Sequence, residues 1–358
     1  MILCSYLNAF GGYEKIMANT ANLFAEKGEQ ITLIILADTA ESFYPFHEKV
    51  RIIQLPLNFG ITPKGNMISR KIKMLRDIRT LRRTLKKPGP SLLIATEYPY
   101  AIASILCRPG KETKIVSWEH THFSVNIKNR FWTKLFRMTY PKLDKIICLN
   151  EDEKKLFRPI NDKVAVIPNF VERSSTAAGL QNKTILTVAR LAPIKGIPHL
   201  LQAAKLVLNS YPDWQWKIIG EGELEKEVTG FIEKEDLQNK LILQKPVDQN
   251  IRSEYQNAAM LVMTSLNECF PMVLLEALSN GLPCIAFDCD TGPRHIITHN
   301  EDGLLVEKED PAKLSEAIAQ LITNEEQRKK MGERAFENVL RFSPEKIYEL
   351  WKKLLDDR

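Results

Sequence analysis

The chain has 358 residues, of which 44% are apolar and 26% charged, the composition of a soluble globular protein long enough for two domains. No apolar run approaches the roughly 18–20 residues that cross a bilayer, and the first residues are typical of a strand rather than a signal peptide. Residues 1–170 carry 27 basic and 15 acidic side chains, whereas the remainder carries 23 and 29. The basic half predicts an anionic partner.

Short β-branched runs alternate with longer helical stretches along the chain. The runs lie at 1–7, 30–36, 51–55, 91–97, 114–120, 145–150, 163–168, 184–190, 214–222, 240–246, 258–265, 283–288 and 303–308. Apolar strands separated by helices predict parallel sheets that are covered on both faces. The two series join near Pro168, so we expect two doubly wound domains with a cleft between them. Ligands of such sheets bind beyond the carboxyl ends of the strands. Six scattered cysteines without a CxxC pair favour buried free thiols in a reducing compartment.

Two turns of the first half carry residues that suit a ligand. The first strand runs into Gly11 and Gly12, and a glycine pair lets the backbone approach an anion at a helix N-terminus. By itself this pattern differs little from an ordinary strand-to-helix turn. His120 and His122 close the fifth strand-like run. No acidic or cysteine cluster with ligand spacing accompanies them, so we do not expect a metal site there.

Residues 68–87 form the most basic segment. Apolar side chains recur at three- and four-residue steps, which predicts an amphipathic helix, and nine Lys and Arg residues against Asp77 make its other face cationic. A second basic stretch, 126–145, interleaves aromatic residues with cations. Such surfaces bind anionic lipid headgroups, at roughly 1 kcal/mol per cation; a solvated helix face is the alternative. Nucleic acid is not expected, because no recognition module is evident.

Charged residues and glycines follow the strands of the second half. Arg190 and Lys195 flank the turn after the run at 184–190, where two cations can clamp a diphosphate. Solvated surface cations are the alternative interpretation. Gly222 closes a Gly-Glu-Gly turn, which allows a ligand to approach the backbone closely.

The stretch 265–288 is the most informative part of the sequence. Glu268 lies in a loop after a strand, and Pro271 suits the first turn of the helix that follows. Glu276 is the only charge of that apolar helix. A buried carboxylate needs hydrogen-bonding partners, and paired ribose hydroxyls would serve. The alternative is a glutamate that reaches solvent at a domain edge.

Glu268 and Glu276, separated by seven residues around Phe270-Pro271, resemble the E-x7-E signature of the family 4 glycosyltransferases of GT-B fold. The resemblance implies an α/β chain with two facing Rossmann-like, doubly wound parallel-sheet domains and an inter-domain cleft. The implied parts are an N-terminal acceptor-binding domain at 1–169, a nucleotide-sugar-binding domain at 170–340 and a helix at 341–358 that crosses back to the first domain.

The resemblance also assigns roles to matching residues. Glu276 would hold the nucleotide ribose, Arg190 and Lys195 the diphosphate, and the catalytic pair Glu268 and His120 would lie at the transferred sugar, with His122 as the fallback for His120. The other implied substrate contacts are Gly11, Gly12 and Glu14 toward the diphosphate and acceptor, Gly222 at the nucleotide, the backbone of Pro246 and Val247 at the base, and Phe270 and Pro271 in the signature. Tyr13 is bulkier than the family pattern leads one to expect.

Asp288-Cys289-Asp290 spells D-x-D, the metal–diphosphate motif of the other large glycosyltransferase fold. Here it follows a late strand of a GT-B-like chain, where the family needs no metal. We therefore expect no metal and no cofactor besides the donor substrate, and a loop that flanks the donor sugar.

With this resemblance, we expect a retaining transfer of a hexose or N-acetylhexosamine from a nucleotide diphosphate sugar, with UDP as the expected nucleotide. The expected acceptor is a glycan on polyprenyl diphosphate, which places the enzyme in the cytoplasm on the inner membrane face. Retention is implied by the resemblance alone. Two alternatives stay open: a nucleotide-sugar epimerase on the same fold, and a non-catalytic membrane-associated partner protein.

Overall fold

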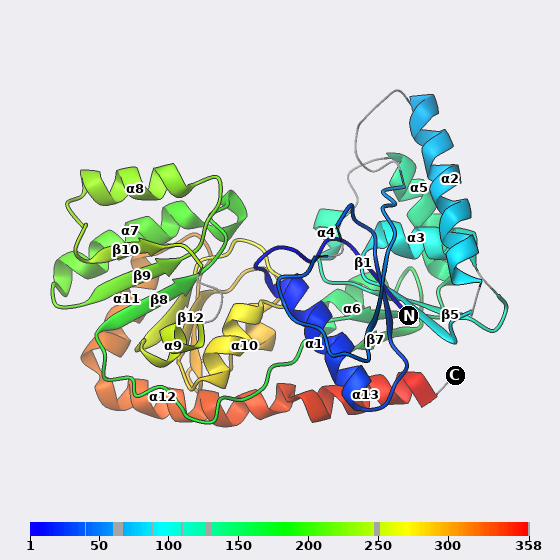
Figure 1. Ribbon diagram of the computed structural model, residues 1–358. Helices are drawn as coiled ribbons and strands as arrows, with labels where there is room; N and C mark the ends of the chain where they lie inside the picture. Colours follow the sequence, from blue (N-terminus) through cyan, green and yellow to red (C-terminus); the bar gives the residue numbers. More distant parts are fainter. Residues whose placement is uncertain are drawn as a thin grey trace. The chain divides into compact units, whose positions relative to one another are not determined.

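The computed structural model describes residues 1–39, 41–59, 67–86, 89–108, 110–126, 130–246 and 251–356. The chain forms two compact units. The first comprises Met1–Pro168 together with Glu345–Arg358, and the second comprises Asn169–Pro344. Each unit is a parallel sheet with flanking helices (Figure 1). The fold class expected from the βα rhythm, two Rossmann-like sheets, is confirmed.

The first unit contains a seven-stranded sheet of order β3-β2-β1-β4-β5-β6-β7, in which neighbouring strands pair in parallel. The strands are Ile2–Cys4 (β1), Thr32–Ile35 (β2), Arg51–Gln54 (β3), Leu92–Ala95 (β4), Lys114–Trp118 (β5), Lys145–Cys148 (β6) and Val164–Val166 (β7). The helices are Gly12–Glu26 (α1), Met67–Leu85 (α2), Tyr98–Cys107 (α3), Phe123–Asn126 (α4), Arg130–Thr139 (α5), Glu151–Phe157 (α6) and the C-terminal Pro344–Asp356 (α13).

The second unit contains a six-stranded sheet of order β10-β9-β8-β11-β12-β13, again with parallel neighbours. The strands are Thr184–Val188 (β8), Gln215–Ile219 (β9), Leu241–Gln244 (β10), Met260–Met263 (β11), Cys284–Phe287 (β12) and Gly303–Val306 (β13). The helices are Ile197–Ser210 (α7), Glu225–Lys234 (α8), Ile251–Gln256 (α9), Met272–Ser279 (α10), Pro311–Thr323 (α11) and Glu325–Asn338 (α12).

Local sequence explains where several helices begin. Asn150 and Asp310 cap α6 and α11, where each side chain accepts a hydrogen bond of 2.9 Å from the backbone N–H three residues on. Proline occupies the first turn of α3, α7 and α11, where its missing N–H removes no helical bond. These helix starts follow strands, so they lie beside the carboxyl ends of the sheet.

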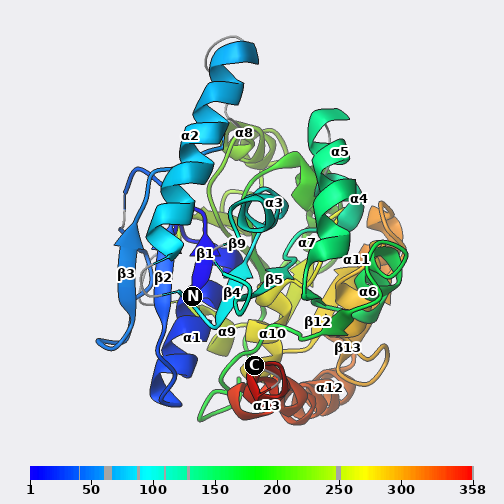
Figure 2. The ribbon, with the colours of Figure 1, turned by 90° about the vertical axis from the view of Figure 1, so that its right-hand side faces the viewer.

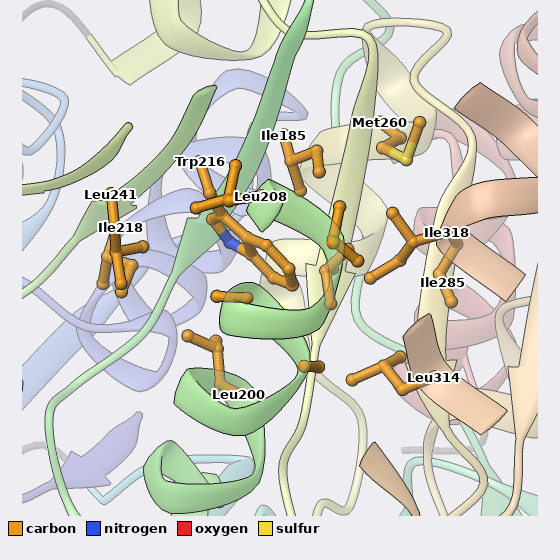
Figure 3. Close-up of a cluster of buried hydrophobic side chains, with 14 of the residues drawn as sticks. Ile185, Leu200, Leu208, Trp216, Ile218, Leu241, Met260, Ile285, Leu314 and Ile318 are labelled. Atoms are coloured by element: carbon orange, nitrogen blue, oxygen red, sulfur yellow. The ribbon is translucent and has the colours of Figure 1, made fainter. Parts of the chain in front are cut away.

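The core of the second unit surrounds Trp216, which is fully buried on β9 (Figure 3). Its indole N–H donates to the Thr187 hydroxyl at 3.0 Å, and Thr187 donates to the Val262 carbonyl at 2.9 Å. These two hydrogen bonds leave the indole N–H and the Thr187 hydroxyl proton satisfied, so Trp216 is buried without an unsatisfied donor. The two hydrogen bonds connect β9, β8 and β11 at the centre of the sheet.

The basic helix α2 exists as predicted, but only its second half packs into the first unit. Leu81 and Leu85 are buried, whereas Ile72 and Leu75 are 47% and 53% exposed. Asp77, between these halves, is buried and accepts a hydrogen bond of 2.9 Å from the Phe59 backbone N–H. Helix α2 extends beyond the sheet in both views (Figures 1 and 2). One half of its apolar stripe therefore packs in the core, and the other half faces solvent.

In both sheets the strand order reverses once, between β1 and β4 and between β8 and β11. Open parallel sheets bind ligands beyond the carboxyl ends of the strands at such a reversal. All six cysteines are buried free thiols, so that prediction is confirmed. No described helix is long and apolar enough to cross a membrane.

Candidate active site

The turn after β8 lies against the turn after β11 in the second unit. Arg190 is exposed directly after β8, and Lys195 ends a short 3-10 turn, Pro193–Lys195. The Thr264 hydroxyl donates to the Lys195 carbonyl at 2.9 Å. Gly196 follows at φ +63, and a Cβ there would lie 2.1 Å from the Thr264 carbonyl oxygen. Only glycine fits this close approach, which holds Lys195 at the strand-order reversal.

Lys195 and Glu268 meet in an ion pair although they lie 73 residues apart. The Lys195 Nζ–Glu268 Oε1 distance is 2.5 Å, and the two side chains are 24% and 14% exposed. The Glu268 backbone carbonyl accepts from the Thr291 hydroxyl at 2.6 Å. Gly292 lies at φ +89 on the other side, where a Cβ would come within 2.9 Å of the same oxygen. The loops after β11 and β12 thus hold Glu268 beside the cation.

Glu276 lies on α10, eight positions after Glu268, and its side chain is half-buried. Its Oε2 accepts from the hydroxyl of the buried Tyr255, on α9, at 2.7 Å. The carboxylate thus has a protein partner, which the sequence did not reveal. Phe270 is buried and packs edge-on against Phe342 at 5.5 Å, so its ring is part of the core of the second unit. Pro271 is buried at the N-cap of α10.

The glycine turn after β9 lies on the turn after β8. Gly222 has φ +152, and a Cβ would lie 2.5 Å from the Leu191 carbonyl oxygen; at Gly220 it would lie 1.9 Å from the Ala189 carbonyl oxygen. Leu191 N–H donates to the Glu221 carbonyl at 2.8 Å. The glycines are therefore needed for backbone contact with the Arg190 turn. Pro246 is half-buried after β10, and Val247 lies outside the described residues.

The D-x-D carboxylates are both paired with cations. Arg294 Nε donates to Asp288 Oδ1 at 2.9 Å, and Lys308 Nζ lies 3.5 Å from Asp290 Oδ1. Among the residues that the structure describes, no group of three or more His, Cys, Asp or Glu side chains could hold a metal ion. Both carboxylates of this loop therefore have a cationic partner, and the expectation that no metal is used stays a prediction.

In the first unit, the turn after β1 leads into α1 through Gly11, its N-cap, and Gly12, its first residue. The Glu14 side chain is buried and folds back toward this turn, since a Cβ on Gly11 would lie 2.2 Å from Glu14 Oε2. A carboxylate in a first helical turn is stabilised by the helix dipole. Glu14 thus occupies the place that the glycine pair suggested for an anion.

His120, two residues after β5, lies between two aromatic rings. Its ring centroid is 4.2 Å from that of Trp118 and 5.4 Å from that of Tyr13, which meets it edge-on. Its Nε2 is buried and has no hydrogen-bond partner within the described ranges. Burial lowers the pKa of His120 to about 3, so the imidazole is neutral at physiological pH.

His122 has different surroundings. Its Nδ1 contacts the buried carboxylate of Glu153, which also accepts from the Phe123 backbone N–H at 3.1 Å. His122 is itself buried, so it holds the turn after β5 to the N-terminus of α6. His122 is thus engaged with Glu153, whereas His120 has a buried Nε2 without a partner among the described residues; the choice of His120 for the transferred sugar stays a prediction.

Two family models match consecutive parts of the chain. The model of Glycosyltransferase Family 4 matches residues 10–175, and that of Glycosyl transferases group 1 matches residues 170–338. The chain belongs to the family 4 glycosyltransferases. It is therefore a glycosyltransferase enzyme, and the resemblance inferred from the E-x7-E pattern is confirmed.

Relatives of this glycosyltransferase include proteins of bacterial glycan synthesis. The amylovoran biosynthesis glycosyltransferase AmsD of Erwinia amylovora is 27% identical over 99% of both chains. A Campylobacter jejuni N-acetyl-D-galactosaminyltransferase, whose name specifies a PP-undecaprenol-linked glycan, is 25% identical over 96% of this chain and 95% of its own. A variant of S. aureus TarM, crystallised with fondaparinux, alpha-GlcNAc-glycerol and UDP, has a TM-score of 0.81 at 16% identity and shares the fold over 99% and 98% of the two chains.

In this glycosyltransferase, polar side chains that sequence reasoning did not single out also gather near the carboxyl ends of β1 and β4. Glu97 lies two residues after the end of β4 and is half-buried. Burial raises its pKa, a hydrogen bond from the Ser5 side chain opposes that rise, and the charge of Glu14 adds to it. The Tyr13 hydroxyl donates to Thr96 Oγ1 at 2.6 Å and accepts from the Ser5 backbone N–H at 3.3 Å. The sequence signal that could have singled out these side chains is their position just after β1 and β4, because open parallel sheets bind ligands beyond the carboxyl ends of their strands.

Proposed function

We propose that this glycosyltransferase carries out a retaining transfer of a hexose or N-acetylhexosamine from a UDP-linked sugar. The proposed acceptor is a glycan on polyprenyl diphosphate, in the synthesis of a cell-surface polysaccharide. The observation that carries the proposal is the Lys195–Glu268 ion pair, 2.5 Å long, at the carboxyl ends of β8 and β11. A cation at this place can stabilise the diphosphate as it leaves. A carboxylate beside the cation can interact with the transferred sugar as the bond to the diphosphate breaks.

The donor roles follow from the turns of the second unit. Arg190 is exposed in the same turn that carries Lys195, and two cations can neutralise the negative charge that grows on the diphosphate as the glycosidic bond breaks. Glu276 is oriented by Tyr255, and a carboxylate accepts several hydrogen bonds, including those from ribose hydroxyls. Gly222 leaves backbone exposed to the nucleotide. Because the D-x-D carboxylates have cationic partners, the proposed reaction does not use them for a metal.

The first unit would supply the contact to the transferred sugar through His120. A neutral imidazole whose Nε2 is unsatisfied can exchange a hydrogen bond with a sugar hydroxyl without adding charge. Glu14 and Glu97 lie near each other at the ends of β1 and β4, where carboxylates can accept from acceptor hydroxyls. These side chains support an acceptor role for the first unit.

We propose the lipid-linked acceptor and the peripheral location at the inner membrane face together, because both rest on apolar side chains exposed on two basic helices. Ile72 and Leu75 are exposed within the cationic helix α2, and Phe131 and Met138 are 41% and 53% exposed on the basic helix α5. Apolar side chains among cations suit the interface of an anionic membrane. The Campylobacter relative, named for a PP-undecaprenol-linked glycan, supports the same class of acceptor.

Thermal unfolding with UDP, GDP, ADP and CMP tests the donor site. A nucleotide at a hundred times its Kd stabilises the native state by about 2.7 kcal/mol, a clear rise in melting temperature. We expect this rise with UDP, and we expect Arg190→Ala and Glu276→Ala to abolish it. Lys329→Ala, in an exposed pair with Glu325 on α12, is the matched control and should respond as the natural chain does. Equal responses in all four proteins would refute the assignment.

Product analysis separates transfer from the alternatives. A transferase releases UDP only when an acceptor is present, whereas an epimerase converts the donor sugar without an acceptor. A non-catalytic partner protein does neither. We expect sugar to appear on a polyprenyl-diphosphate-linked glycan with its anomeric configuration retained, and an inverted product would disprove the retaining mechanism.

A further inference from the structure

Four rings form an aromatic column inside the first unit: Trp351, Trp118, His120 and Tyr13. Trp351 of α13 meets Trp118 edge-on, with centroids 5.0 Å apart and planes at 82°. Trp118 lies 4.2 Å from His120, and His120 lies 5.4 Å from Tyr13 of α1 at 88°. The column joins the first turn of α1, the end of β5 and the C-terminal helix, three segments that are far apart in sequence.

Both ends of the aromatic column are held firmly. The Tyr13 hydroxyl donates to Thr96 Oγ1, which donates in turn to the Leu3 carbonyl at 2.9 Å. At the other end, Trp351 is fully buried and packs edge-on against Phe24 of α1 at 5.7 Å. Trp118 is 1% exposed. Edge-on aromatic pairs have preferred geometries, so rings fixed at both ends restrict the ring between them.

His120 has little else that fixes the orientation of its ring. A functional histidine is commonly oriented by a hydrogen bond to the nitrogen that does not act. Within the described segments neither Nε2 nor the other ring nitrogen, Nδ1, has a hydrogen-bond partner, so the packing of the neighbouring rings must supply much of the orientation. The same apolar neighbours exclude water and disfavour the imidazolium form.

We propose that Tyr13, Trp118 and Trp351 are positioning residues, which hold His120 in the orientation and the neutral state that contact with the transferred sugar requires. The C-terminal helix thereby influences transfer without touching substrate. The catalytic consequence rests on the proposed function of His120. The positioning itself does not, and it can be measured on the protein alone.

Histidine-selective NMR across pH 5 to 8 tests the positioning. The chain has six histidines, and the spectrum of His120→Asn identifies the His120 signal by its loss. We expect the natural His120 ring not to titrate, because burial lowers its pKa to about 3. In Trp351→Leu the ring should gain mobility and begin to titrate in this pH range, closer to the ordinary histidine pKa of about 6.5.

Matched variants separate positioning from a general loss of packing. Trp132→Leu makes the same change at another buried tryptophan of the first unit and should leave the His120 signal unchanged. Trp351→Phe restores an aromatic ring and should restore the natural spectrum, and Tyr13→Phe should alter the spectrum less than Tyr13→Leu does. Spectra are recorded well below each melting temperature. An unchanged His120 signal in Trp351→Leu, or an equal change in Trp132→Leu, would overturn the proposal.

Steady-state kinetics with a donor and an acceptor that support transfer measure the catalytic consequence of losing the aromatic column. We expect Trp351→Leu to lower kcat at least about tenfold with the donor KM little changed, because small misplacements of an active group cost large factors in rate. The UDP melting shift should persist, since the nucleotide turns belong to the second unit. If no transfer occurs in the natural chain, the proposed function fails while the NMR result still decides the positioning.

Discussion

Glycine at position 196 shows how one residue can determine the geometry of a site. Gly196 lies at φ +63 with the Thr264 carbonyl 2.1 Å from the place of a Cβ. Lys195 and its partner Glu268 both depend on this contact, because it sets the distance between the turns after β8 and β11. A side chain here would disturb the ion pair before it disturbed either sheet.

We predict that Gly196→Ala destabilises the fold by roughly 1–3 kcal/mol or more, since it combines a left-handed backbone with a backbone clash. Gly230→Ala is the control. Gly230 lies inside α8 with no atom within 4 Å of a Cβ, and alanine in a helix interior should stabilise by up to about 1 kcal/mol. Urea unfolding measures both changes, and equal effects would disprove the steric argument.

Glu119 is a buried acid immediately before His120 that the proposed reaction does not use. It is 2% exposed and accepts hydrogen bonds from Ser117 and from the Tyr140 hydroxyl, at 2.5 Å for the latter. Burial is the main cause that raises its pKa from 4.5 to about 7. The folded chain therefore holds this proton more tightly than the unfolded chain does.

Because the folded state keeps the proton between pH 4.5 and 7, this group contributes stability that is full below pH 4.5 and is lost as pH rises to about 7. The loss is on the order of 3 kcal/mol. We predict that Glu119→Gln removes this dependence. The difference in unfolding free energy between the natural chain and the variant should fall across that range. His120 is present in both proteins, so its own titration cancels, and a difference that is constant with pH contradicts the assignment.

At the scale of elements, α2 carries the main departure from its periodic pattern. The three- and four-residue spacing predicted one continuous apolar stripe, and a stripe normally packs along its length. The second half does so through Leu81 and Leu85, but Ile72 and Leu75 remain exposed among cations. A periodic pattern shows which side chains share a face, and only the length of the underlying sheet decides which of them have something to pack against.

We predict that the double change Ile72→Ser and Leu75→Ser weakens binding to vesicles that contain anionic lipid by more than about tenfold, because each buried aliphatic side chain contributes roughly 1.5–3 kcal/mol. Leu206→Ser, at a side chain 48% exposed on α7 of the second unit, is the control and should bind as the natural chain does. Vesicle co-sedimentation gives the affinities. Binding that survives the double change, or that is equal on neutral vesicles, would refute a membrane role for α2.

At the scale of the whole molecule, the two units differ in net charge, and the C-terminal end of the chain belongs to the first unit. Residues 1–170, which carry the excess of basic side chains, belong almost wholly to the first unit, whereas the cations of the donor turns lie in the acidic remainder. The proposed diphosphate binding would therefore depend on the local charges of Arg190 and Lys195 rather than on the overall field of that half. The chain end then returns to the first unit as α13, where Trp351 enters its core.

The sequence by itself determined the two series of parallel strands, and the family through Glu268 and Glu276. These features are local: strand and helix periods, helix starts and one short motif can each be read within a few residues. The tertiary structure decided which of two histidines retains an unsatisfied nitrogen, which residue partners Glu276, and that Tyr13, Trp118 and Trp351 surround His120. Such contacts join residues up to hundreds of positions apart and depend on burial, and neither separation nor burial leaves a periodic trace along the chain.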